Sequence, residues 1–248
     1  MTTINAPKRP LWRRCLGWVK RHPWLTIIFT LIAGFVFLNG LAYVHASAML
    51  NYSNGLVRTR RPEQLSLGEK IKVLLCGVSL PRPVNSGSPT DIGCPFEVIH
   101  HSTDDGYKLE AWHIAASKSL GTVIMFHGYA GSRSALLKQA KEIYSQGWTV
   151  ILVDFRGSGG SDGNATSLGI KEANDVVAMV GYARERGLPG PLILYGQSMG
   201  AAAILRSVAK YDVKPDAIIL ESVFNRMVTT VRNRFAVMGC HPSRQPNY

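Results

Sequence analysis

Acidic residues are scarce in this chain of 248 residues, which has 16 Asp and Glu against 28 Lys and Arg and a formal net charge of +12. Residues 1–21 hold six of the basic residues and no acidic one, and Arg58, Arg60 and Arg61 form a second small cluster. Elsewhere the two signs are mixed, as on an ordinary solvated surface. Because no groove-reading motif accompanies the basic charge, we expect no nucleic-acid partner.

Cysteine is also sparse, and low-complexity tracts are absent. The four cysteines, Cys15, Cys76, Cys94 and Cys240, lack the paired C-x-x-C spacing of a structural zinc site, so no such site is expected. Two alternatives stay open for Cys76 and Cys94. They could form a disulfide, which would persist outside the cytoplasm, or remain two free buried thiols.

One long apolar run is present, because residues 24–46 contain no Asp, Glu, Lys or Arg. At about 1.5 Å per residue, a helix of this length reaches about 30 Å and can cross the hydrocarbon core of a bilayer. Trp18, Trp24 and Tyr43 lie near its two ends, where interfacial aromatic belts occur. We therefore predict a basic stub over 1–23, followed by one transmembrane helix over 24–46.

The basic stub also predicts the orientation of this helix. Positively charged flanks stay on the cytoplasmic side, so we expect a single-pass membrane protein with a cytoplasmic N-terminus and an extracytoplasmic remainder. The alternative is a cleaved signal peptide, for which residues 45–48 offer a small-residue site. We favour an uncleaved signal anchor, because the apolar run is longer than a typical signal core.

Residues 47–95 form a predicted connector. Within it, four apolar residues recur at helical spacing and predict an amphipathic helix over 66–78. These residues are Leu67, Ile71, Leu74 and Leu75. Proline and glycine then mark a loop that ends at Pro95.

A different pattern begins at residue 96, where short apolar strands alternate with helices. The expected strands cover 96–101, 107–114, 122–126, 148–155, 192–195 and 217–220, and the expected helices cover 134–146, 167–186 and 199–210. Continuous apolar strands separated by helices indicate a mainly parallel sheet with both faces covered. The predicted fold class is therefore α/β, with one mixed sheet that opens with an antiparallel hairpin. We expect residues 96–248 to form this domain.

The segment 196–200 reads G-Q-S-M-G, a G-x-S-x-G motif between an expected strand and an expected helix. In such a turn the hydroxyl of Ser198 projects above the sheet, and the following helix directs its N-terminal amides toward developing negative charge. The alternative is a small-residue turn that permits close packing of a helix on the sheet. Two further motifs favour the nucleophile over the packing turn.

Residues 127–133 read H-G-Y-A-G-S-R after one expected strand, and residues 154–163 read D-F-R-G-S-G-G-S-D-G after the next. The second segment is not a phosphate loop, because no G-K-[ST] follows its glycines. In this order, the three motifs resemble those of the α/β-hydrolase superfamily, particularly its serine-peptidase-like and esterase-like bacterial members. The resemblance covers about residues 96–227.

The resemblance implies an acyl-enzyme on Ser198, with the backbone N–H groups of Tyr129 and Met199 as the oxyanion hole. It gives His127 a structural role, and it implies a small-molecule or peptide acyl substrate with an ester, thioester or amide bond. No metal or organic cofactor is implied, because this chemistry uses side chains only. Nothing in the sequence indicates an oligomeric state.

In this superfamily the catalytic acid and histidine follow the serine along the chain. The candidates after Ser198 are Glu221, at the end of the last expected strand, and His241, in a tail without a strand or helix pattern. Neither lies in a typical catalytic segment, so we expect the C-terminal part of the domain to be missing. Two hypotheses follow: a membrane-anchored serine hydrolase, or a catalytically inactive, truncated hydrolase-like membrane protein without the acid and histidine.

Overall fold

The computed structural model describes residues 18–53, 55, 58–60, 64–223 and 229. The chain divides into two compact units. The helix unit comprises Met1–Ala48 and Arg60–Val78, and the sheet unit comprises Met49–Thr59 and Ser79–Tyr248. The segment that the sequence assigns to a connector is therefore shared between the two units.

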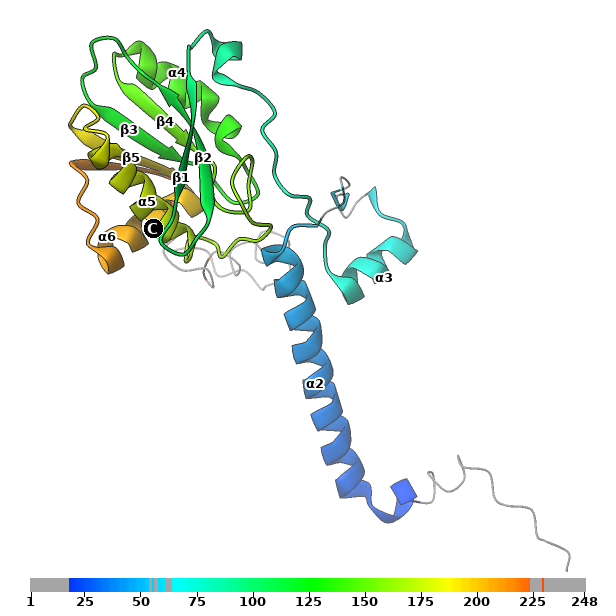
Figure 1. Cartoon of the computed structure of the whole chain (residues 1–248). Helices are drawn as coiled ribbons and strands as arrows, with labels where there is room; N and C mark the ends of the chain where they lie inside the picture. Colours follow the sequence, from blue (N-terminus) through cyan, green and yellow to red (C-terminus); the bar gives the residue numbers. More distant parts are fainter. Residues whose placement is uncertain (1–17, 54, 56–57, 61–63, 224–228, 230–248) are drawn as a thin grey trace, which may run out of the picture. The chain divides into compact units, whose positions relative to one another are not determined.

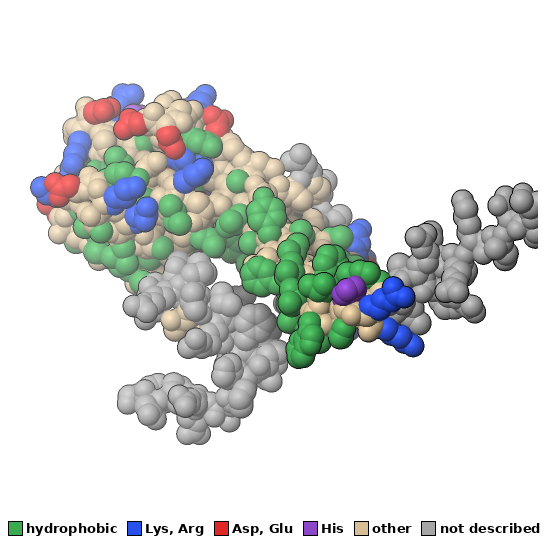
Figure 2. All heavy atoms as spheres, turned by 90° about the horizontal axis from the view of Figure 1, so that it is seen from below, with side chains coloured by type: hydrophobic (Ala, Val, Ile, Leu, Met, Phe, Trp, Pro, Cys, Tyr) green, Lys and Arg blue, Asp and Glu red, His purple; other side chains and the backbone are tan. Residues whose placement is uncertain are grey.

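The long apolar helix α2, Pro23–Leu50, belongs to the helix unit except for its last two residues. Its most apolar 18-residue window has a mean hydropathy of 2.2, and no residue of that window is buried. Hydrophobic side chains predominate along this helix, whereas basic and acidic side chains are interspersed over the sheet unit (Figure 2). α2 is long and apolar enough to cross a bilayer, and it continues four residues beyond the predicted end of the span.

The predicted amphipathic helix is confirmed as α3, Leu67–Cys76. It begins with a capping box, in which Glu69 N–H donates to the Ser66 hydroxyl and Ser66 N–H donates to the Glu69 carboxylate. These bonds hold the pKa of Glu69 below its ordinary value. The helix ends at Gly77, whose φ of 79° lies in the left-handed region that favours glycine.

The sheet unit contains a six-stranded sheet in the order β1-β2-β4-β3-β5-β6 (Figure 1). Its strands are β1 Glu97–Ser102, β2 Lys108–Ile114, β3 Thr122–Phe126, β4 Thr149–Val153, β5 Leu192–Gln197 and β6 Ala217–Glu221. β1, β2 and β4 pair antiparallel, and β4, β3, β5 and β6 pair parallel. This arrangement confirms the predicted mixed sheet with an opening hairpin.

In the described part of the sheet unit, three α-helices and two short 3-10 helices accompany the strands. They are η2 Pro89–Ile92, η3 Arg133–Leu136, α4 Leu137–Ser145, α5 Glu172–Glu185 and α6 Met199–Tyr211. Side chains of β3 alternate between the two faces of the sheet, so successive residues pack in two different hydrophobic clusters. Ile124 and Phe126 pack in the cluster that holds α5 and α6 residues, and Val123 and Met125 pack in the cluster that holds α4 residues. Both faces of the central strands are therefore covered, as their unbroken apolar sequences predict.

The start of α5 differs from the prediction by five residues. Residues 167–171 were expected to be helical, but the loop winds around the buried carboxylate of Glu172 instead. Glu172 accepts bonds from Ser167 N–H at 2.8 Å and Gly169 N–H at 2.9 Å. Leu168 in this loop has a φ of 57°. The backbone N–H groups of this loop thus donate to a side-chain carboxylate instead of to carbonyl groups of a helix, and such hydrogen bonds compete with helix formation.

The structure also decides the state of two cysteines. Cys76 and Cys94 are both free thiols, so the disulfide alternative is not formed. Cys94 is buried, as expected of a free thiol, but Cys76 is exposed, because it belongs to α3, in which no residue is buried.

Candidate functional site

Ser198 occupies the turn between β5 and α6 in a strained conformation. Its φ is 51° and its ψ is −105°, a region that non-glycine residues rarely adopt. Strain of this kind persists where the surroundings enforce it, and it concentrates at functional sites. The conformation therefore favours a nucleophile turn over an ordinary small-residue turn.

The glycines on either side of Ser198 are required by space rather than by their own backbone angles. A Cβ on Gly196 would lie 2.6 Å from Ala201 N, and one on Gly200 would lie 2.3 Å from Phe126 O. Without side chains at these positions, the first turn of α6 lies directly against the end of β3. The close packing of a helix on the sheet, which the alternative interpretation predicts, is therefore present in this turn.

Gly200→Ala is expected to lower the free energy of unfolding by about 2–3 kcal/mol, because a Cβ has no rotamer with which to avoid Phe126 O. Urea unfolding of the full chain in detergent measures this change. The matched control is Gly181→Ala inside α5, where an added Cβ meets nothing within 4 Å. That variant should be neutral or gain up to about 1 kcal/mol. Similar losses in both variants would contradict the close-approach argument.

Met199 is the first residue of α6 and is buried. At this position its N–H has no acceptor within the helix, and the helix dipole adds positive potential. Ser198 is fixed from both sides, because its N–H donates to Glu221 O at 2.8 Å and its carbonyl accepts from Ala202 N–H at 3.1 Å. The Met199 amide is therefore held at the head of the helix beside the serine.

The structure brings the Tyr129 segment against the serine turn. A Cβ on Gly128 would lie 3.7 Å from Ser198 Cβ. The chain then reverses, because Ala130 has a φ of 55° and Gly131 N–H donates to Gly128 O at 3.2 Å. The amides of Tyr129 and Met199, which the sequence pairs as oxyanion donors, thus belong to two adjacent turns.

His127 is buried, and both of its ring nitrogens are engaged by backbone groups. Nε2 accepts from Phe155 N–H at 3.1 Å, so Nδ1 carries the proton that it donates to Gly128 O at 2.8 Å. Burial lowers the pKa of His127. This neutral histidine joins the loops after β3 and β4, and it has no free nitrogen to accept a proton from Ser198.

The 154–163 loop is held by buried charges. Asp154 accepts from Arg133 N–H at 2.7 Å, from Asn85 Nδ2 at 2.8 Å and from Gly160 N–H at 3.0 Å. Arg82 donates from its guanidinium to Gly159 O at 2.7 Å and to Gly163 O at 3.1 Å. These hydrogen bonds fix the conformation of the loop after β4. The sequence did not identify Asn85 and Arg82 as residues that hold this loop.

The side chain of Glu221, at the end of β6, is hydrogen-bonded to two neighbouring side chains. Its carboxylate accepts from the Tyr195 hydroxyl, and from Gln197 Nε2 at 3.3 Å. Burial, together with this carboxylate, raises the pKa of Tyr195 to about 12. Ser198 Oγ makes no hydrogen bond to a histidine of the described ranges, and His241 lies outside them.

A short strap, residues 49–53, leaves the end of α2 and crosses the edge of the site. Tyr129 Oη donates to Met49 O at 2.6 Å, and Thr166 N–H donates to Leu50 O at 2.8 Å. Tyr52 N–H donates to Asn164 O at 2.9 Å. The strap therefore joins the Tyr129 segment to the loop before α5.

Several hollows lie on the described part of the sheet unit, and two of them have volumes above 500 Å³. The first, of about 620 Å³, has walls that include Leu50, Thr166, Leu168 and Ile170. The hydroxyl of Thr166 lies 3.2 Å from Met199 Sδ, which places this hollow next to the head of α6. Its walls are mostly apolar.

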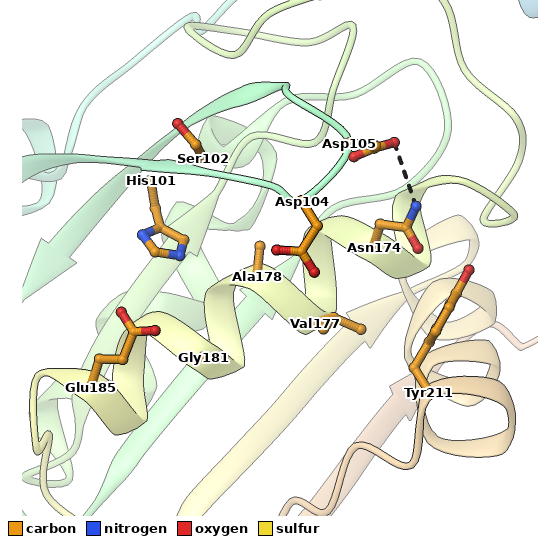
Figure 3. A pocket seen from close by; sticks show the side chains of 10 residues that line it. All are labelled: His101, Ser102, Asp104, Asp105, Asn174, Val177, Ala178, Gly181, Glu185 and Tyr211. Carbon is orange, nitrogen blue, oxygen red and sulfur yellow. Dashed lines mark hydrogen bonds between the residues drawn. The ribbon is translucent and has the colours of Figure 1, made fainter.

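The second hollow, of about 510 Å³, lies between the β1–β2 turn, α5 and the last residue of α6 (Figure 3). His101, Asp104 and Glu185 point toward it, and Asn174 donates to Asp105 at 3.5 Å. Tyr211, which contributes to this hollow, lies 13 residues after Ser198, or about 20 Å along α6 at 1.5 Å per residue. In the described part of the chain, no group of three or more His, Cys, Asp or Glu is arranged to hold a metal ion.

Known proteins are similar to this chain in sequence and in fold. Residues 117–238 match the family model described as serine aminopeptidase, S33. The uncharacterized membrane protein YNL320W of Saccharomyces cerevisiae is 32% identical over 138 residues, which make up 55% of this chain and 49% of that protein. Lysophosphatidylserine lipase ABHD12 of Danio rerio is 31% identical over 122 residues, 47% of this chain and 31% of that protein.

Among solved structures, the Pyrococcus furiosus esterase Pf2001 superposes with a TM-score of 0.59 and 27% sequence identity, covering 65% of this chain and 63% of that chain. The chain spans about half the length, or less, of the curated relatives named above. The mixed sheet, the serine turn at the head of α6 and these similarities together show that the chain belongs to the α/β-hydrolase superfamily.

Proposed function

We propose that the protein is a serine hydrolase, which cleaves an ester, thioester or amide bond through an acyl-enzyme on Ser198. The observation that carries this proposal is the strained Ser198 conformation at the head of α6, with the Tyr129 segment packed against it. A serine held in this way presents its hydroxyl above the sheet, where an acyl carbon can approach.

In the proposed reaction Ser198 Oγ attacks the acyl carbon, and the carbonyl oxygen becomes an oxyanion. The amides of Tyr129 and Met199 donate to that oxygen, and each such donor contributes about 2.7–4 kcal/mol of transition-state stabilisation. The serine proton passes to a general base and then to the leaving group. Water next attacks the acyl-enzyme, which releases the acid and restores Ser198.

Among the candidates for the other catalytic residues, Glu221 is disfavoured as the acid because Tyr195 and Gln197 engage its two oxygens. His127 is disfavoured because both of its nitrogens bind backbone groups. The proposal therefore assigns no base, because His241, the other candidate after Ser198, lies in a tail without the pattern of a catalytic segment. The rival hypothesis, an inactive hydrolase-like membrane protein, is favoured by the lack of a histidine at Ser198 within the described residues.

The proposed substrate is a small-molecule or peptide acyl compound. The hollow beside Met199 is lined by Leu50, Leu168 and Ile170, and it suits an apolar group on the acyl or leaving side. The esterase and lipase named among the similar proteins support carboxylic esters as the first compounds to examine. α2 supports a membrane location, and the cytoplasmic position of its N-terminus remains a prediction.

A fluorophosphonate probe tests the proposal, since it reacts with activated serines only. We expect the full chain in detergent to be labelled, and Ser198→Ala to abolish labelling. Ser145→Ala, at an exposed serine that ends α4, is the matched control and should label fully. A folded chain that stays unlabelled would favour the inactive alternative, and labelling that survives Ser198→Ala would refute the assigned nucleophile.

A further inference from the structure

The helix α3 exposes an apolar face that no described residue covers. Four of its residues lie on this face, at helical spacings of four, three and one. Their exposed fractions are 76% for Leu67, 51% for Ile71, 59% for Leu74 and 50% for Leu75. Scattered apolar residues are normal on a protein surface, but a contiguous stripe along one helix marks an interaction site.

Two lysines flank the apolar face. With about 100° between successive residues, Lys70 and Lys72 project to opposite sides of the stripe formed by Leu67, Ile71 and Leu74. Both lysines are exposed, while the only acidic residue of the helix, Glu69, is engaged in the capping box. An apolar stripe with lysines on both margins is typical of helices that lie in the headgroup region of a bilayer.

α3 is attached to the last turns of α2, within the same unit (Figure 1). His45 Nε2 hydrogen-bonds Leu74 O at 2.8 Å, and a Cβ on Gly77 would lie 2.8 Å from Ala48 Cβ. His45 and Ala48 lie at the end of the apolar run that the sequence identifies as the span. When α2 crosses a bilayer, α3 is therefore held at the depth where hydrocarbon meets headgroups.

We propose that α3 is a second membrane element, an interfacial helix whose apolar face enters the leaflet from which α2 emerges. Leu67, Ile71, Leu74 and Leu75 contact the acyl boundary, and Lys70 and Lys72 reach the phosphates of anionic lipids. The opposite side of the helix, which carries Cys76, faces water. This assignment depends on the helix unit alone, and it does not rest on the hydrolase chemistry.

Site-directed fluorescence in proteoliposomes tests the proposal with the full chain. One variant carries Ile71→Cys with the four native cysteines replaced by serine, and the control keeps only Cys76, on the opposite side of the same helix. Each is labelled with a nitrobenzoxadiazole probe in vesicles of phosphatidylcholine and phosphatidylglycerol. We expect the probe at position 71 to be blue-shifted and quenched several-fold more by shallow nitroxide lipids than the probe at Cys76. Iodide should quench the probe at Cys76 preferentially.

Two outcomes would overturn the assignment. Equal iodide quenching at both positions would show that the apolar face stays in water. Protection of position 71 from both iodide and nitroxide lipids would show that a protein surface covers it, either a partner or a second copy of the chain. A Leu74→Cys variant provides a second probe position, so that a labelling failure at position 71 leaves the test intact.

Discussion

Ser198→Ala and Ser198→Gly are both expected to lose hydrolysis of an activated ester by about 10⁴-fold or more, but to differ in stability. Alanine retains the strained φ of 51°, whereas glycine adopts this region without a Cβ clash. The glycine variant should therefore be the more stable of the two by about 1 kcal/mol, although glycine usually destabilises a folded chain. The kcat for a p-nitrophenyl ester and the urea midpoint are the two measurements.

The pair of variants separates chemistry from folding. If the serine turn stores strain, Ser198→Gly and Ser198→Ala lose activity alike, but the glycine variant is the more stable of the two. Wild-type turnover in either variant would disprove the acyl-enzyme on Ser198. A glycine variant no more stable than the alanine variant would show instead that the turn carries no stored strain, and the conformational argument for a nucleophile would be lost.

Arg156→Met is expected to lower the free energy of unfolding by about 3–5 kcal/mol, the cost of leaving a buried charge without its partner. The buried guanidinium donates to Asp175 at 2.8 Å through Nε and to Asp105 at 2.6 Å through Nη1. Asp175 is fully buried, so it supplies most of the effect, and the half-exposed Asp105 supplies less because solvent screens it. Lys214→Met, which breaks the exposed pair with Asp212, should cost at most about 1 kcal/mol.

The stability that Arg156→Met loses should increase as the pH rises. Burial raises the pKa of Asp175, and the Arg156 guanidinium opposes that rise. Without the arginine, the folded-state pKa of Asp175 exceeds its unfolded value further, so the carboxyl contributes stability at low pH that is lost as the pH rises through the folded pKa. Urea unfolding at pH 5 and pH 8 should therefore show the larger deficit at pH 8. Adding Asp175→Asn to Arg156→Met should restore part of the stability, and a deficit independent of pH would contradict this account.

The pKa of Asp105 shifts in the other direction. Its hydrogen bonds from Arg156 hold that pKa well below its ordinary value. In the wild-type chain this carboxylate contributes stability above its unfolded pKa, which is lost as the pH falls through the lower folded pKa. The ionisation of Asp105 therefore changes the free energy of unfolding at low pH, whereas that of Asp175 changes it at higher pH. When the arginine is removed, Asp175 is the carboxyl group that destabilises the folded chain at neutral pH.

The central sheet was predictable because its signal is local. β3 has the predicted bounds, since an unbroken apolar run between glycine and a His-Gly turn allows few alternatives. α6 was predictable from the glycines around Ser198 and the alanines that follow. The start of α5 was not, because the acceptor that unwinds residues 167–171 is the Glu172 side chain, whose burial depends on the folded loop.

The supporting residues of the site could not be read from the sequence, for a related reason. Asn85 lies 69 residues from its partner Asp154, and Arg82 lies 77 residues from Gly159. Both come from the segment predicted as a connector, which carries no motif. Such contacts depend on which loops meet at the edge of the sheet, and spacing along the chain does not encode that. Ser198, Tyr129 and Met199 could be proposed as site residues from the sequence because a known family repeats their motifs.

The strap of residues 49–53 ties together two loops at the candidate site. Met49 accepts a hydrogen bond from the Tyr129 hydroxyl, and Leu50 accepts one from Thr166 N–H. Met49 and Tyr129 are 80 residues apart in the sequence, so this contact joins parts of the chain that no motif spans. A substitution that alters the backbone of the strap would therefore disturb the Tyr129 segment and the loop before α5 together, although it would lie outside every motif that resembles a hydrolase.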